Sequence, residues 1–179
     1  MYFQVVEILS GTSSTTMSWT WFQNLIGVSL SEFQMRDIPH PHLELTVHVT
    51  FKCVEAFGLL GMCVVGPISA LSRPSARDLT GVKNSALKCG KWGVLLGTVA
   101  GPAMTYLRLK SSNATEASVY DRCYRLRYNR NQVRVDRGAL AGAVAGSALA
   151  VPAGASPMVG ALLGMSAGLL SMGFYNNKK

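Results

Sequence analysis

The sequence predicts an all-α membrane protein, a four-helix transmembrane bundle whose helices pack through glycine zippers. Three features lead to this prediction: a low content of charged residues, long stretches without charge, and glycine at every fourth position. Of the 179 residues, 49% are hydrophobic and only 15% are charged, whereas a soluble domain usually has about 25% charged residues. The alternative is a soluble bundle of long buried helices. The charge-free stretches disfavour it, because they offer no polar face to water.

The distribution of charge places four transmembrane helices. Residues 93–107 and 138–177 carry no charged side chain. The second stretch is too long for one span, which needs about 20 residues, and Pro152 and Pro157 favour a turn within it. The expected spans cover residues 54–71, 90–107, 137–150 and 158–174.

Glycine recurs at the spacing by which helices pack in a bilayer. Lipid tails are as apolar as leucine, so helices associate through small residues that let two backbones approach closely. Glycine inside a helix costs about 0.5–1 kcal/mol relative to alanine, so its repetition on one face indicates a packing role. We expect this role for Gly90, Gly93, Gly97 and Gly101 in the second helix, Gly138, Gly142 and Gly146 in the third, and Gly160, Gly164 and Gly168 in the fourth.

The start of the third helix, DRGALAGAVAGSALA, combines an acidic residue with regularly spaced small residues. In this pattern the chain resembles the Tim17/Tim22/Tim23 superfamily of the mitochondrial inner membrane. Asp136 fits the acidic position of that family's signature, and Gly142 and Gly146 fit its small-residue part. The spacing departs from the signature, because Gln132 occupies the position four residues before Asp136 and Arg134 lies only two residues before it.

The resemblance implies a multi-pass protein of the mitochondrial inner membrane. The departures from the signature are closer to the four-helix accessory subunit of respiratory complex I than to the translocase subunits of the superfamily. The expected function is therefore that of a non-catalytic structural subunit that stabilises the membrane arm of this NADH:ubiquinone oxidoreductase, with other subunits of a large membrane complex as its partners. A subunit of an inner-membrane protein-import translocase is the alternative. A small-solute channel is disfavoured, because the predicted spans have few polar side chains.

Two regions are expected along the chain. Residues 1–42 form an N-terminal extension that lies partly at the membrane interface, because the rings of Trp19, Trp21 and Phe22 are typical of that location. Residues 43–177 form the four-helix membrane domain, in which a basic connector, residues 108–137, joins the second and third spans.

The connector contains many of the residues behind the net charge of +8. Arginines interleaved with tyrosines also occur in nucleic-acid-binding segments, but between two membrane spans they more often meet anionic headgroups or acidic partners. Asn113, followed by Glu116, predicts the start of a surface helix, with a solvated connector as the alternative. We expect anionic lipid such as cardiolipin as a partner, and no nucleic acid. The expected lipid or partner surface consists of Arg122, Arg125, Arg127 and Arg130.

The sequence contains no pattern that is typical of a catalytic or metal site, and no cofactor is expected. The histidines of His40-Pro41-His42 are separated by a proline, which makes them a poor ligand pair. Lys52 and Glu55 are three residues apart at the start of the first span and are expected to pair with each other. The cysteines lack metal-type spacing, and a disulfide among them remains open: Cys53, Cys63, Cys89 and Cys123.

Overall fold

The computed structural model describes residues 19–178, and all regular elements in that range are helical. The predicted all-α class is therefore confirmed for this part of the chain. Two short helices, α2 (Thr20–Ile26) and α3 (Glu32–Arg36), come first. The remaining elements are α4 (Pro41–Leu60), a π-helical turn (Gly61–Val65), α5 (Gly66–Leu71), a 3-10 turn (Pro74–Ala76), α6 (Leu79–Ser111), α7 (Glu116–Tyr128), α8 (Arg130–Ala150) and α9 (Pro157–Asn177).

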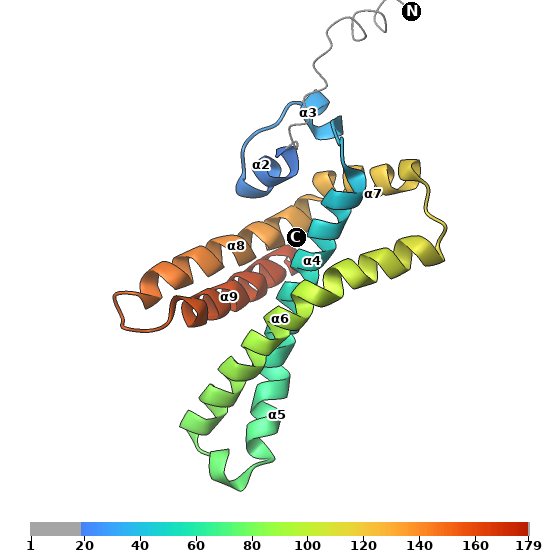
Figure 1. The fold of residues 1–179 in the computed structure, drawn as a ribbon. Helices are drawn as coiled ribbons and strands as arrows, with labels where there is room; N and C mark the ends of the chain where they lie inside the picture. The colour runs from blue at the N-terminus through green and yellow to red at the C-terminus, as the bar shows by residue number, and fades with distance from the viewer. Residues whose placement is uncertain (1–18, 179) are drawn as a thin grey trace, which may run out of the picture.

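The long helices form two helical hairpins rather than one parallel-sided bundle (Figure 1). In the first hairpin, α4 and α5 pack along α6, and in the second, α8 packs along α9. The hairpins meet where Leu162 and Met165 of α9 enter a notch at Gly58 of α4, and a Cβ built on Gly58 would lie 3.1 Å from Met165 Cε. The two hairpin loops point in different directions (Figure 1), so large parts of both hairpins have no neighbour among residues 19–178.

The π-helical turn at Gly61–Val65 lets one continuous helix pass through Pro67. Proline has no backbone N–H, and its ring clashes with the carbonyl four residues earlier in a regular helix. One wide turn before the proline absorbs this mismatch without ending the helix. The combined helix Pro41–Leu71 therefore remains long enough to pair with most of α6.

Glycines line the contact between α4 and α6, as their spacing predicts. A Cβ on Gly93 would overlap the Phe57 carbonyl, one on Gly101 would overlap Thr50 Cα, and one on Gly97 would lie 2.7 Å from the Cys53 carbonyl oxygen. Gly90 differs from these three. Its missing side chain makes room for Leu162 of α9, whose Cδ2 atom would lie 2.6 Å from a Cβ there.

Six glycines form the contact between α8 and α9. They face one another in antiparallel pairs, and a Cβ on most of them would overlap the backbone carbonyl of the opposite helix. Gly138 is the exception, because its missing side chain accommodates Met172. The pairs are Gly138 with Gly168, Gly142 with Gly164, and Gly146 with Gly160.

Two helices are long and apolar enough to cross a membrane, Pro41–Leu71 and Pro157–Asn177. They contain the first and fourth predicted spans. The helices of the second and third predicted spans, α6 and α8, fall short of the same combination of length, hydropathy and charge. Glycine and alanine allow close packing but add little hydropathy. The charge-free part of α8, residues 138–150, is also only about 20 Å long at ~1.5 Å per residue, against a hydrocarbon core of about 30 Å.

A helix forms in the predicted basic connector, but it begins later than expected. Asn113 has a positive φ of 44° and lies outside the helix. The N-cap of α7 is Thr115, whose side chain accepts a hydrogen bond from the Ser118 backbone N–H. On the next helix, α8 begins at Arg130 instead of residue 137, so part of the predicted connector is its first two turns.

The described part of the predicted N-terminal extension packs against the helical body. Arg137 of α8 donates hydrogen bonds to the Asn24 and Leu25 carbonyls at 2.6 and 3.0 Å. Tyr120 of α7 donates to the Arg36 carbonyl at 2.7 Å. Residues 1–18 of the extension lie outside the described part of the chain.

Replacing Gly142 by alanine is expected to lower the midpoint of thermal unfolding, because the methyl group would overlap the Gly164 carbonyl. Overpacking of this kind costs about 1–3 kcal/mol. Gly173→Ala on α9 is the matched control, since nothing lies within 4 Å of a Cβ there and alanine is the better helix former by ~1 kcal/mol. Circular dichroism of both proteins in the same detergent makes the comparison. Equal midpoints would contradict the close α8–α9 contact.

Candidate functional site

Arg127 of α7 is the most highly connected side chain in the structure's polar interior. Its guanidinium is 2% exposed. Its Nε and Nη2 atoms donate to the two carboxylate oxygens of Glu44, both at 2.7 Å. Its Nη1 donates to the carbonyls of Gln34, Met35 and Asp37 at 3.0–3.1 Å. A planar fork of five N–H donors suits this bidentate pairing, so one side chain joins α7 to the start of α4 and to the end of α3.

Short polar contacts surround this pair and complete the junction. The Asn24 side chain of α2 donates to the Arg127 carbonyl at 3.0 Å. The Cys123 thiol, one turn earlier on α7, donates to the Pro41 carbonyl at 3.2 Å. Burial raises the pKa of the Cys123 thiol to about 12, and the charge of Glu44 adds to this effect while Arg127 opposes it. Cys123 is therefore a protonated, buried thiol.

A second charged cluster joins α4 to α8 further along both helices. Lys52 forms ion pairs with Glu55, at 2.5 Å, and with Asp136. His48 Nδ1 lies 3.9 Å from the other Asp136 carboxylate oxygen, and Gln132 donates to Asp136 at 3.2 Å. The predicted Lys52–Glu55 pair is thus present, and Asp136 extends it. The Lys52 ammonium thus lies between two buried carboxylates, those of Glu55 and Asp136.

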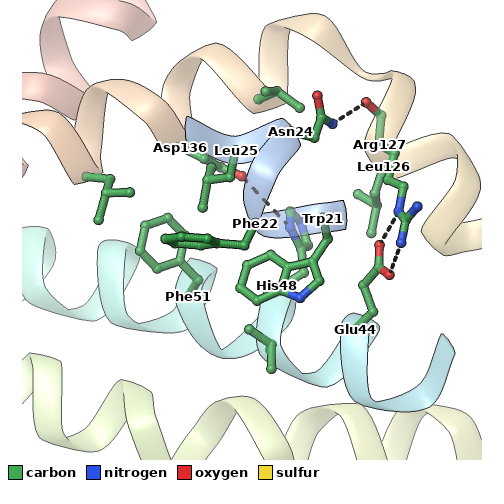
Figure 2. A pocket seen from close by; sticks show the side chains of 13 residues that line it. Trp21, Phe22, Asn24, Leu25, Glu44, His48, Phe51, Leu126, Arg127 and Asp136 are labelled. Atoms are coloured by element: carbon green, nitrogen blue, oxygen red, sulfur yellow. Dashed lines mark hydrogen bonds and ion pairs between the residues drawn. The ribbon is translucent and has the colours of Figure 1, made fainter. Parts of the chain in front are cut away.

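An apolar cavity of about 260 Å³ lies between these two charged groups (Figure 2). α2 closes one side of it with Trp21 and Phe22, and α4 contributes Phe51. Glu44 and Arg127 lie at one end, while His48 and Asp136 line another part of the wall (Figure 2). An apolar cavity with a few convergent polar groups is the usual form of a ligand site.

A groove of about 580 Å³ lies next to this cavity, between the α2–α3 segment and the beginning of α8. Its wall contains Arg130, Arg134 and Arg137. Arg137 is held by the α2 carbonyls, whereas Arg134 makes only a long hydrogen bond of 3.4 Å to Asn131. Together the cavity and the groove are the candidate functional site: an apolar space beside a cationic one.

The residues predicted as a lipid or partner surface have different positions in the structure. Arg125 and Arg130 are exposed, and Arg122 is half-buried. Arg127 is buried and paired, so its assignment to that surface is wrong. The reason is that α7 turns this one arginine toward Glu44, while its neighbours on the helix point elsewhere. Of the two residues compared with the family signature, Asp136 is buried in the α4–α8 cluster, and Arg134, whose spacing departs from the signature, lines the groove.

Three residues of the site were not predicted as site residues from the sequence. Glu44, His48 and Phe51 lie three or four residues apart on α4. This spacing is common to any helix face, so it does not indicate a site. Trp21 and Phe22, which were predicted to lie at the membrane interface, also line the cavity. All four cysteines are free thiols, and no group of three His, Cys, Asp or Glu side chains within residues 19–178 is arranged to hold a metal ion.

Most of the chain matches one known protein family. Residues 21–175 match DUF1757, a family described as proteins of unknown function. The chain belongs to the DUF1757 family. The match covers α2 to α9 and thus includes both hairpins, the cavity and the groove. No curated protein sequence matches the chain.

The resemblance to the Tim17/Tim22/Tim23 superfamily is therefore wrong. The match to DUF1757 spans the segment that carried it, and nothing indicates the other superfamily. The small-residue spacing that resembled its signature has a local explanation in this DUF1757 protein, because Gly142 and Gly146 contact Gly164 and Gly160 of the neighbouring helix.

In this DUF1757 protein, Glu44→Gln is expected to destabilise the fold, because the buried Arg127 guanidinium loses its counter-charge. Removing one partner of a buried ion pair costs about 3–5 kcal/mol. The control is Asp121→Asn, which breaks the exposed Asp121–Arg125 pair at 2.7 Å, a type of pair worth about 0–1 kcal/mol. Thermal unfolding measures both. A Glu44→Gln protein as stable as the control would show that the Arg127 junction is dispensable.

Cys123 is expected to resist alkylation in the folded protein. With a pKa of about 12, roughly one thiol in ten thousand is ionised at pH 8, and the thiolate is the reactive form. An Ala117→Cys variant places an exposed thiol on the same helix and serves as the control. Mass spectrometry after N-ethylmaleimide treatment should find label on residue 117 within minutes and on Cys123 only after denaturation. Comparable labelling of both would contradict the buried position of Cys123.

Proposed function

We propose that this DUF1757 protein is a non-catalytic structural subunit of a multi-subunit membrane assembly, with α4–α5, α6, α8 and α9 as a multi-pass membrane domain. Its role is to hold neighbouring subunits through helix packing. The observation that carries the proposal is the uncovered apolar face of α6, on the side opposite its glycines.

The outer face of α6 is apolar along much of the helix. Trp92, Leu96 and Val99 are 59%, 60% and 73% exposed, and Tyr106 and Leu107 continue the face toward the end of the helix. A contiguous apolar surface of this kind marks a protein or membrane contact. Because α6 is less apolar overall than a helix that crosses a membrane by itself, contact with other subunits accounts for this face better than lipid alone.

The divergence of the two hairpins supports the same function. The α5–α6 and α8–α9 hairpin ends separate, so they do not pack against each other (Figure 1). Exposed Val144 and Leu149 on α8 add a second uncovered apolar surface. Neighbouring subunits that fill the space around these ends would complete the packing.

Two assemblies are proposed for the first tests. They are respiratory complex I of the mitochondrial inner membrane and an inner-membrane protein-import translocase. The match to DUF1757, a family of unknown function, supports neither assembly over the other. The uncovered apolar faces are equally compatible with the two.

Native gel electrophoresis of a mild-detergent extract tests the proposal. The protein is expected to migrate far above its own mass of 19.2 kDa. Co-migration with NADH dehydrogenase activity would assign it to complex I, and co-migration with import machinery would assign it to a translocase. Migration as a monomer in every mild detergent would contradict a subunit role.

Replacing Leu96 and Val99 together by serine is expected to reduce the assembled fraction by about tenfold or more, because each buried side chain of this size contributes about 1.5–3 kcal/mol. Leu79→Ser is the control, since Leu79 is 86% exposed on α6 but lies at its first residue, outside the apolar face. The assembled and free forms are quantified on the same native gel. Full assembly of the double variant would mean that this face is not the docking surface.

A further inference from the structure

The groove beside the apolar cavity has an excess of positive charge. Arg130 has no ion-pair or hydrogen-bond partner within the described residues, and the bond from Arg134 to Asn131 is long. The acidic residue in the groove wall, Glu32, is already paired with Arg36 at 2.5 Å. Arg127 is likewise neutralised by Glu44. The guanidinium groups of Arg130 and Arg134 are therefore free to bind an anion.

The groove and the apolar cavity are adjacent. Asn24, Arg127 and Val133 line both of them. Trp21 and Phe22, together with Phe51, give the cavity an aromatic, apolar lining (Figure 2). Its volume of about 260 Å³ is below the roughly 300–1,000 Å³ that encloses a whole small-molecule ligand, so it suits one apolar chain of a larger molecule.

We propose that the cavity and groove together bind one anionic phospholipid, with the phosphate on Arg130 and Arg134 and the end of one acyl chain between α2 and α4. Guanidinium groups are well suited to phosphate oxygens because of their planar donor geometry. An anion at this place also lies near the N-terminal end of α8, where helix dipoles favour negative charge. The combination of a free cationic groove and an adjoining apolar cavity matches an amphipathic anion.

This proposal relocates lipid binding from the face of α7 to the beginning of α8. Arg122 and Arg125 do not line the groove or the cavity. They provide a matched control, because removing them changes the net charge by the same amount on the neighbouring helix. The inference rests on the membrane location in the proposed function, but it can be tested on the isolated chain.

The test uses the full chain in a neutral detergent, with Trp19→Phe and Trp92→Phe, so that Trp21 in the cavity is the remaining tryptophan. Phosphatidylglycerol and phosphatidylcholine with the same brominated acyl chains are added, because bromine quenches tryptophan fluorescence at close range. Phosphatidylglycerol is expected to quench Trp21 at an about tenfold lower mole fraction than phosphatidylcholine. Inorganic phosphate, which has no acyl chain, is added as a competitor in a separate measurement.

Substitutions then separate headgroup binding from chain binding. Arg130→Gln with Arg134→Gln should remove the preference for phosphatidylglycerol, whereas Arg122→Gln with Arg125→Gln should keep it. Val47→Phe, which fills part of the cavity from α4, should reduce quenching by either lipid and leaves the arginines in place. Circular dichroism confirms that each variant is folded, and the Val47→Phe result is available even if the groove variant fails to fold.

Three results would overturn the proposal. Equal quenching by the two lipids would remove the role of the headgroup charge. An equal loss of preference in the two double-arginine variants would indicate a general charge effect. Competition by inorganic phosphate at the same concentration as the lipid would indicate an anion site that does not use the acyl chain. None of these results depends on the native gel, so failure here is distinguishable from failure of the subunit proposal.

Discussion

Close approach of helix backbones at glycine is the constraint on which this structure depends. In both hairpins a side chain would occupy the space that the opposite carbonyl fills, most directly at Gly93 in the first hairpin and at Gly142 in the second. Because few large apolar side chains are buried between the helices, their cohesion comes from backbone-to-backbone contact over a long interface. The apolar side chains are left for the outer faces, where they are available to neighbours.

Buried charged side chains fix the positions of the helices relative to one another. In an ordinary hydrophobic core, apolar side chains do this. Arg127 holds α7 to α4, and Asp136 holds α8 to α4 through Lys52. Buried ion pairs contribute little net stability but penalise wrong arrangements strongly, because an unpaired buried charge is expensive. The cavity lies between the Arg127–Glu44 pair and the Lys52–Asp136 pair, and α2 closes one side of it.

Local patterns predicted that the chain is helical and where its glycines recur, but they placed four membrane spans where two helices are long and apolar enough to cross a membrane. Small residues spaced four apart indicate one face of a helix that packs closely on another, so a packing role for Gly97 and Gly146 was predictable from the sequence. The same generality misled the family assignment, since any closely packed membrane helix pair favours this spacing. The role of Arg127 was not predictable, because its partner Glu44 is 83 residues away and its neighbours on α7 are arginines of the same appearance. The start of α7 was missed because Thr115, two residues after Asn113, is the capping residue.

The distance along the chain between Glu44 and Arg127 has a consequence for biosynthesis. At about 5–20 residues per second, the ribosome adds Arg127 roughly 4–17 s after Glu44, by which time the whole first hairpin is available to fold. Until then the Glu44 carboxylate and the carbonyls of residues 34, 35 and 37 lack the guanidinium that donates to them in the folded chain. The junction therefore forms late in synthesis, and in a chain that stops before α7 these groups can bond only to water or to other partners.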